Sequence, residues 1–221
     1  GVYLHAGPEI SVASTKAFSS QVAVLLMMAL LLGRNRRLSR SEGSELAREI
    51  EQAPELIRQV LAQAETIRAI AKQYAAFDDF FYIGRGCLYP TALEGALKLK
   101  EISYVHAEGY HAAELKHGPI ALLDERHPVL ALANDIPGRE KILGNIQECR
   151  ARRAPVVAVA TVGDREVEQL TDDVIFVPAC SRFIAPLPTA VALQLFAYFI
   201  AVERGCEIDQ PRNLAKSVTV E

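Results

Sequence analysis

A lysine close to the C-terminus could do covalent chemistry. Lys216 lies between Asn213 and Val220, among Leu214, Ala215 and Val218. A free lysine has a pKa near 10.4, so only about one amine in a thousand is neutral at pH 7.4. An amine nucleophile therefore needs desolvation or a nearby cation. The apolar neighbours could supply desolvation if the tail folds over a site, although the pattern also fits a surface lysine or an ion-pair partner of the terminal carboxylate.

Three charged residues form a second candidate group on one face of a predicted helix. Glu94, Lys98 and Glu101 stand at i, i+4 and i+7 in a helix expected from Pro90 to Ser103. Spacing alone favours a solvated stripe of intrahelical ion pairs, each contributing roughly 0.2 to 0.5 kcal/mol. A catalytic interpretation gains weight from the titratable residues that follow this helix.

His117 is the strongest proton-transfer candidate among the histidines. It precedes Gly118-Pro119 and is expected on a loop, where an imidazole can titrate near neutral pH. His106 and His111 are weaker candidates. The intervals between these three histidines match no helical metal motif, so we expect no metal site.

A glycine-rich turn offers an anion site as a further possibility. Gly84-Arg85-Gly86 follows a predicted strand and precedes a helix, so its backbone amides could approach an anion. Two glycines after a strand are more often a tight βα turn. The sequence contains neither GxGxxG nor a Walker lysine, so we expect no nucleotide and no cofactor.

Composition limits the class of protein. At 221 residues, half of them apolar, the chain can bury one full core plus an appendage. A net charge of -3 gives no field for nucleic acid or an anionic membrane, so neither partner is expected. Four cysteines without a CxxC pair favour a reducing cytoplasm. The opening Gly1 to His5 is typical of the end of a strand, which predicts a fragment of a longer protein.

Three helices are predicted before residue 75. Ser14-Thr15 can cap a helix that runs to Leu32 and stops at Gly33. Its apolar run from Val22 to Leu32 is too short to cross a bilayer, so we expect a buried helix between layers. The polar residues 35–43 mark a boundary. Two amphipathic helices should follow, at about Ser44 to Glu51 and Pro54 to Tyr74.

From Phe80 onward, short apolar runs alternate with segments of helical length, which predicts an α/β fold with a parallel sheet in a three-layer αβα sandwich. Ligands of such sheets gather beyond the carboxyl ends of the strands, here after Ile83, Ala133 and Val177. The predicted strands are Phe80–Ile83, Val129–Ala133, Val156–Ala160 and Val174–Val177. The helices expected besides Pro90 to Ser103 are Gly138–Arg153, Asp164–Leu170 and Pro188–Arg204.

Several strings are similar to one enzyme family. They are ALEGALKLKEISY from Ala92, AELKHGP from Ala113, DQPRNLAKSVTVE from Asp209 and AGPEISVASTKAF from Ala6. Together they resemble the isomerase region of the glutamine:fructose-6-phosphate amidotransferases, also called glucosamine-6-phosphate synthases. The resemblance covers essentially the whole chain.

The resemblance implies an architecture of sugar-isomerase (SIS) lobes, each with a five-stranded parallel sheet of flavodoxin-like topology. Residues 1–37 would be the remnant of a preceding lobe, 38–205 a second SIS domain, and 206–221 a catalytic tail that acts as a lid. The family's glutaminase domain and the first lobe's serine- and threonine-rich phosphate loop have no counterpart here. The fragment alone is therefore expected to be inactive.

The resemblance also implies catalytic roles. Lys216 corresponds to the amine that forms a Schiff base with open-chain fructose 6-phosphate, and Glu101 to the base that moves a proton between carbons 1 and 2. His117 corresponds to the residue that opens the sugar ring across a dimer interface, so we expect a homodimer. In the longer parent, glutamine-derived ammonia would yield glucosamine 6-phosphate.

Supporting residues follow from the same resemblance. Lys98 corresponds to a site lysine beside Glu101, and Glu94 to a carboxylate that orients a lysine. Val12 and Ala215 correspond to backbone contacts with the sugar. Two departures, Gly109 and Ala113 in place of alanine and glycine, are expected to adjust a loop only.

A non-catalytic alternative stays open. An SIS module could bind a sugar phosphate or amino sugar for regulation or dimerisation without catalysis. Such a module is not expected to keep Glu101, His117 and Lys216 together. The combination therefore favours an enzyme lineage.

Overall fold

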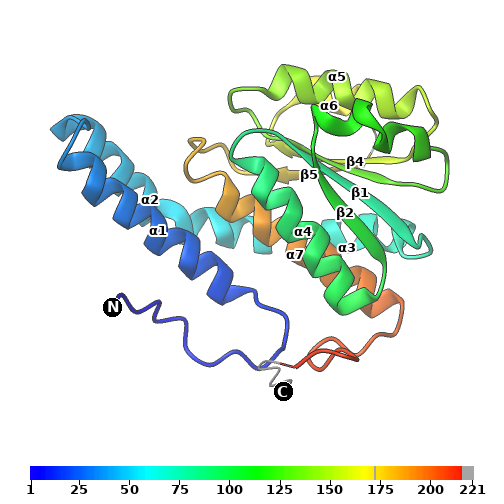
Figure 1. The fold of residues 1–221 in the computed structure, drawn as a ribbon, viewed down its shortest axis with the longest axis horizontal. Helices are drawn as coiled ribbons and strands as arrows, with labels where there is room; N and C mark the ends of the chain where they lie inside the picture. The colour runs from blue at the N-terminus through cyan, green and yellow to red at the C-terminus, as the bar shows by residue number, and fades with distance from the viewer. Residues whose placement is uncertain (172, 216–221) are drawn as a thin grey trace.

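The fold is a five-stranded parallel sheet between two layers of helices, as the sequence predicts (Figure 1). The computed structural model describes residues 1–171 and 173–215. The strand order β2-β1-β3-β4-β5 is the flavodoxin-like order. The strands are β1 (Asp79–Gly84), β2 (His106–His111), β3 (Val129–Ala133), β4 (Val156–Thr161) and β5 (Asp173–Val177).

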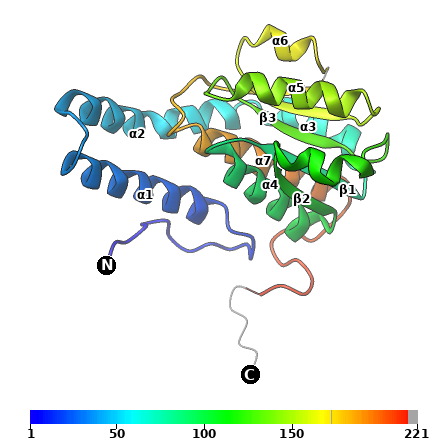
Figure 2. The ribbon, with the colours of Figure 1, turned by 45° about the horizontal axis from the view of Figure 1, so that its top comes forward.

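Alternation along the strands builds the two halves of the core. Phe80 and Tyr82 face one layer, whereas Phe81 and Ile83 face the other, as a period of two requires. Figure 2 shows the sheet between these layers. The first layer contains α3 (Ala64–Tyr74), α4 (Leu88–Ser103) and α7 (Pro186–Glu203). The second contains α5 (Arg139–Arg150), α6 (Arg165–Glu168) and the 3-10 turns η1 (Glu114–His117) and η2 (Pro119–Leu122).

Strand β2 has no counterpart among the strands predicted from residue pattern. It lies at the sheet edge and pairs only with β1, and Ala107 is its one buried residue. A strand with so little buried surface carries no apolar run. Gly109 belongs to this strand, which corrects the expectation that it adjusts a loop. A Cβ at Gly109 would lie 2.9 Å from the Cα of Leu93, so α4 packs directly against the β2 backbone.

The first helix is less buried than expected. α1 (Lys16–Arg34) forms a hairpin with α2 (Arg40–Leu61), and none of its residues is buried (Figure 1). Val22 and Leu26 turn toward α2, whereas Leu25 and Leu31 are exposed. The expectation of a helix between layers is therefore wrong for the described chain, because α1 packs mainly against α2 and, over a smaller area, against α7.

Among the described residues, two helices, α1 and α7, are long and apolar enough to cross a membrane by length and composition. α7 instead forms the centre of one helical layer, where Leu193 and Phe196 are fully buried. This observation explains its apolar sequence without a membrane.

Helix boundaries in the hairpin also differ from those predicted. The start of α1 is capped by the Glu9 carboxylate and not by the hydroxyl of Ser14 or Thr15. This carboxylate accepts hydrogen bonds from the backbone amides of Thr15 and Ala17, both at 3.0 Å. α2 continues through Pro54 and ends at Leu61. Its start is fixed by a capping box in which Ser39 and Glu42 bond to each other's backbone amides.

The segment that precedes α1 meets the start of the C-terminal tail. The Val12 amide donates to the Asp209 carbonyl at 3.0 Å, and the Ser11 hydroxyl donates to the Ile208 carbonyl at 3.3 Å. Figure 1 shows this meeting of the blue and red segments. The domain boundaries at 37/38 and 205/206 stay predictions.

Candidate functional site

Helix α4 carries three of the predicted catalytic residues, Glu94, Lys98 and Glu101, and its close approach to the core fixes its position. Ala92, Ala96 and Leu99 are buried against the sheet layer. A Cβ at Gly95 would lie 2.5 Å from Cδ1 of Leu193 and 3.0 Å from the Tyr82 ring. The contact between α4 and α7 therefore depends on a glycine at position 95.

A buried cation lies between two carboxylates on the opposite stripe of α4. The Lys98 side chain is 3% exposed, and its Nζ donates a short hydrogen bond to Glu101 Oε2. The same Nζ lies 3.7 Å from Glu94 Oε1. The side chains of Glu94 and Glu101 are 11% and 23% exposed. These residues are thus not the solvated stripe that spacing alone favours.

The electrostatics of this triad single out Glu94. Burial raises the pKa of Glu94, the charge of Lys98 lowers it, and Glu101 raises it, with a raised pKa as the net effect. Glu94 Oε1 is buried and has no hydrogen-bond partner among the described residues. A buried acceptor of this kind costs free energy unless a partner arrives.

Lys98 lines a cavity of about 190 Å³. Four parts of the chain form its wall, namely the segment before α1, α4, α7 and the tail. Gln194 on α7 is a wall residue that the predicted site lacks, and its Nε2 is buried without a hydrogen-bond partner in the described chain. Its signal in the sequence was a glutamine in the middle of a mostly apolar helix. The wall residues are Ser11, Ala13, Thr15, Lys98, Ile102, Gln194, Tyr198, Ile208 and Asp209.

The tail residues of the predicted site lie at the edge of what the structure describes. Val12 is next to the tail, and its amide already bonds to Asp209, so a sugar contact by Val12 would use its carbonyl oxygen. Ala215 is exposed and is the last described residue of the tail. Lys216 lies outside the described residues.

His117 lies far from Glu101 within one chain. The Ala112 amide donates to the Gly84 carbonyl at 2.9 Å, so the end of β2 lies beside the end of β1, where α4 begins. His117 follows in η1 and is exposed. Glu101 stands near the other end of α4, and a 16-residue helix is about 24 Å long. The structure therefore brings Glu94, Lys98 and Glu101 together, and leaves His117 apart from them.

The other two histidines have structural contacts. His106 Nδ1 lies 2.7 Å from Asp79 Oδ1 at the exposed sheet edge. The His111 ring packs edge-on against Tyr89, with 5.5 Å between centroids. Among the described residues, no three His, Cys, Asp or Glu side chains form a group that could hold a metal.

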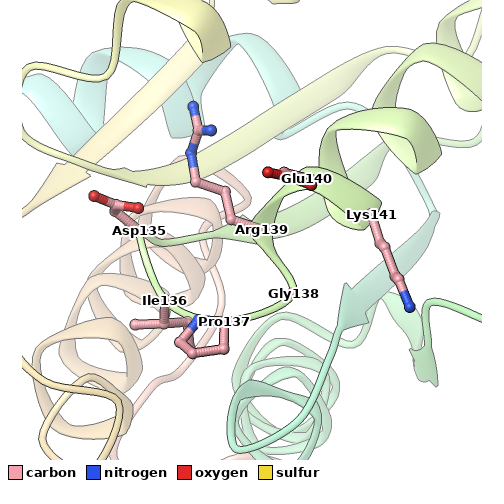
Figure 3. Close-up of a pocket in the computed structure, with 7 residues that line it drawn as sticks. All are labelled: Asp135, Ile136, Pro137, Gly138, Arg139, Glu140 and Lys141. Carbon is pink, nitrogen blue, oxygen red and sulfur yellow. The ribbon is translucent and has the colours of Figure 1, made fainter.

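The carboxyl ends of the strands carry open hollows. The loop after β3 surrounds a cavity of about 490 Å³, and Figure 3 shows the Arg139 and Lys141 side chains pointing away from each other there. Arg139 is engaged by Asp164, with 2.7 Å from its Nε to Oδ2, and by Glu166 at 3.0 Å. The Arg139 guanidinium is thus paired with two carboxylates at the start of α6.

The Gly84-Arg85-Gly86 segment fits the tight-turn interpretation. The amides of Leu88 and Tyr89 donate to the carbonyls of Arg85 and Gly86. A Cβ at Gly84 would lie 2.4 Å from the Leu88 carbonyl oxygen. The glycine thus makes room for a sharp turn into α4.

Comparisons with known proteins give the relatives of this fold and site. A model of the SIS domain matches residues 74–204. The chain is 52% identical over its whole length to the glutamine–fructose-6-phosphate aminotransferase [isomerizing] of Chlorobaculum tepidum, of which it covers 36%. It is also 52% identical over its whole length to the enzyme of the same name from Thermus thermophilus, covering 37% of it. The chain thus spans little more than a third of these relatives and matches their C-terminal part.

A solved structure shares the fold closely. The C-terminal domain of glucosamine-fructose-6-phosphate aminotransferase from Francisella tularensis superposes with a TM-score of 0.88 at 35% identity. The match covers 92% of this chain and 58% of that one. The α/β architecture described above is therefore also that of a structure with a related sequence.

Proposed function

The chain belongs to the SIS domain family, and from this premise we propose that it forms the C-terminal part of the isomerase region of a glutamine–fructose-6-phosphate aminotransferase. The full-length protein would convert fructose 6-phosphate and glutamine-derived ammonia to glucosamine 6-phosphate. Identity of 52% over the whole chain supports the assignment. The observation that carries it is the buried Lys98 between Glu94 and Glu101 at the wall of a cavity.

The proposed chemistry begins at Lys216. Its neutral amine adds to the C2 carbonyl of the open-chain sugar and loses water, which forms a Schiff base. Ammonia then adds to C2 and displaces the lysine nitrogen, which leaves as a free amine. The Glu101 carboxylate takes the proton from C1, which the adjacent C=N bond has made acidic, and returns it to C2, while the C1 hydroxyl loses its proton and the C2 nitrogen gains one. The product is a 2-amino aldose, and both residues are regenerated.

Lys98 and Glu94 support this sequence by position and charge. The hydrogen bond from Lys98 fixes the carboxylate of Glu101, the proposed base. A fixed ammonium also favours the neutral form of a second amine nearby, as Lys216 requires. Glu94 lies on the other side of Lys98 and holds that cation in place. Val12 and Ala215 would contribute backbone contacts to the sugar.

A homodimer belongs to the same proposal. His117 lies at the opposite end of α4 from Glu101, so one chain does not place both at one sugar. We assign ring opening to His117 of the partner subunit. Each site would then combine Glu94, Lys98, Glu101 and Lys216 of one chain with a histidine of the other.

The isolated chain is expected to be inactive. It covers 36% of the length of the Chlorobaculum relative, and the resemblance places the phosphate-binding loop and the glutaminase domain outside it.

The four cysteines of the chain are all free thiols, in keeping with the proposed cytoplasmic location.

Proton exchange at the sugar tests the role of Glu101. Full-length protein incubated with fructose 6-phosphate, glutamine and D₂O should incorporate deuterium at the carbons between which the proton moves. Glu101→Gln should abolish this incorporation and the amino sugar product, whereas Glu51→Gln on exposed α2 should leave both unchanged. Undiminished incorporation with Glu101→Gln would refute the role of the carboxylate. Sugar-phosphate binding by the wild type without exchange or product would favour the non-catalytic module.

A further inference from the structure

We infer that Tyr104 and Arg212 form a clamp that holds the C-terminal tail against the end of α4, which makes Tyr104 a positioning residue for the reaction proposed above, on which this inference rests. The Arg212 amide donates a hydrogen bond of 2.9 Å to the Tyr104 hydroxyl. The Arg212 guanidinium carbon lies 4.2 Å from the centroid of the Tyr104 ring. One tail residue is thus held at two points, by its backbone and by a cation–π contact.

The backbone of Tyr104 points to a role beyond ending a helix. Tyr104 follows the last residue of α4, Ser103, and has φ 60° and ψ 17°, the left-handed conformation. Glycine or asparagine normally takes this position, because a Cβ there is strained. A bulky residue persists in such a conformation when its surroundings require the side chain. Here both the hydroxyl and the ring face of that side chain contact Arg212.

The clamp connects the two halves of the proposed site. Tyr104 comes three residues after Glu101, so the two stand about one turn apart. Arg212 comes four residues before Lys216, and four residues reach at most about 14 Å. The clamp therefore limits how far the proposed nucleophile can move from the helix that carries the proposed base.

Other contacts fix the start of the tail and leave the clamp as the attachment nearest to Lys216 among those described. The Cys206 thiol lies 3.7 Å from the Ser103 carbonyl. The Ile208 and Asp209 carbonyls bond to Ser11 and Val12. Since these bonds hold the first part of the tail without Tyr104, loss of the clamp should release mainly the part that leads to Lys216.

Three variants separate the two contacts of the clamp. Tyr104→Gly removes both and relieves the left-handed backbone, so the fold should be retained. Tyr104→Phe removes only the hydrogen bond, and Arg212→Met only the cation–π contact. Arg36→Met, an exposed arginine between α1 and α2, is the matched control.

Two readouts on the full-length protein test the clamp. Amide hydrogen exchange should show faster exchange at residues 210–215 in Tyr104→Gly, with strands β1 and β3 unchanged. Borohydride trapping of fructose 6-phosphate on Lys216 should slow at least about tenfold in Tyr104→Gly. It should slow about 3- to 10-fold in Tyr104→Phe, the effect of one modest hydrogen bond. Arg212→Met should fall in the same range, and Arg36→Met should match the wild type in both readouts.

The possible outcomes distinguish the clamp from the function on which it rests. Unchanged exchange of residues 210–215 in Tyr104→Gly would overturn the clamp. Faster exchange with wild-type trapping would overturn its role in positioning Lys216. Wild-type protein that traps no sugar on Lys216 would overturn the proposed function, and the exchange data would still decide whether Tyr104 holds the tail.

Discussion

Lys98 is the residue that decides how the charged face of α4 is interpreted. On a solvated helix surface, Glu94, Lys98 and Glu101 would contribute little and would need no explanation. At 3% exposure, Lys98 has given up hydration that only well-placed partners offset. A carboxylate of raised pKa, Glu94, beside a buried cation at the wall of a cavity marks a candidate functional site. The spacing could predict the common face, but only the fold reveals its burial.

Replacing Glu94 should change how stability depends on pH. The pKa of Glu94 is raised in the native protein, chiefly by burial. Between the unfolded value near 4.5 and the raised native value, the native state binds more protons than the unfolded state, so stability falls as pH rises. Glu94→Gln removes this titration. Its stability relative to wild type should therefore increase as the pH rises from about 4.5 toward neutrality.

Equilibrium urea unfolding of both proteins across this pH range measures the difference. Glu55→Gln, at an exposed ion pair with Arg58, is the matched control for replacing a glutamate by glutamine. A relative stability of Glu94→Gln that stays constant or falls with pH would contradict a raised pKa at Glu94.

Among the elements, the position of α4 against α7 determines whether Lys98 lines the cavity. Gly95 lies next to Glu94, and its missing side chain allows the two helices to approach. Gly144, in α5, provides a natural comparison, because a Cβ there would meet no atom within 4 Å. Both are helical glycines, so helix propensity affects them alike.

The two glycines should respond oppositely to alanine. Gly95→Ala should destabilise the protein by about 1 to 3 kcal/mol through overpacking against Leu193 and Tyr82, and should lower activity. Gly144→Ala should stabilise it by about 0.5 to 1 kcal/mol. Urea midpoints measure both effects. Equal stabilisation by the two substitutions would show that α4 does not depend on close contact at Gly95.

Elements with strong local signals could be predicted from the sequence, and those set by tertiary context could not. Strands β1, β3, β4 and β5 were predicted because each contains a run of mostly buried apolar residues. Edge strand β2 was missed, since burial of Ala107 alone leaves no apolar run. The burial of α1 was predicted wrongly, because hydropathy does not reveal what covers a helix. A proline favours the first turn of a helix, which predicts a helix start at Pro54, yet α2 continues through this residue.

The proposed site residues also differ in whether the sequence could place them. The i, i+4, i+7 spacing placed Glu94, Lys98 and Glu101 on one face, and the structure brings them together. No local pattern could place the tail beside α4, because that contact joins residues such as Tyr104 and Arg212, about a hundred positions apart. The family resemblance, rather than any residue pattern, supplied the role of His117.

At the scale of the whole molecule, separation of His117 from Glu101 predicts that two chains share each site. Purified His117→Ala and Glu101→Gln proteins should each be nearly inactive. After mixing and subunit exchange, activity should recover to about a quarter of the wild-type value. Half of the dimers would then be mixed, and one of the two sites in each mixed dimer would be intact.

Activity assays together with analytical ultracentrifugation measure this recovery. A mixture of His117→Ala with the double variant His117→Ala, Glu101→Gln is the control and should stay inactive. If mixing restores no activity although subunits exchange, both residues act within one chain and the shared site is wrong.

Covalent trapping on the tail is the most direct test of the central claim, that Lys216 and the α4 triad form one active site. Full-length protein treated with fructose 6-phosphate and borohydride, then digested and analysed by mass spectrometry, should carry the reduced sugar on Lys216. Lys216→Arg should remove the label, and Glu101→Gln should retain it, because the Schiff base precedes proton transfer. Sugar on a different lysine, or full labelling of Lys216→Arg, would contradict the account.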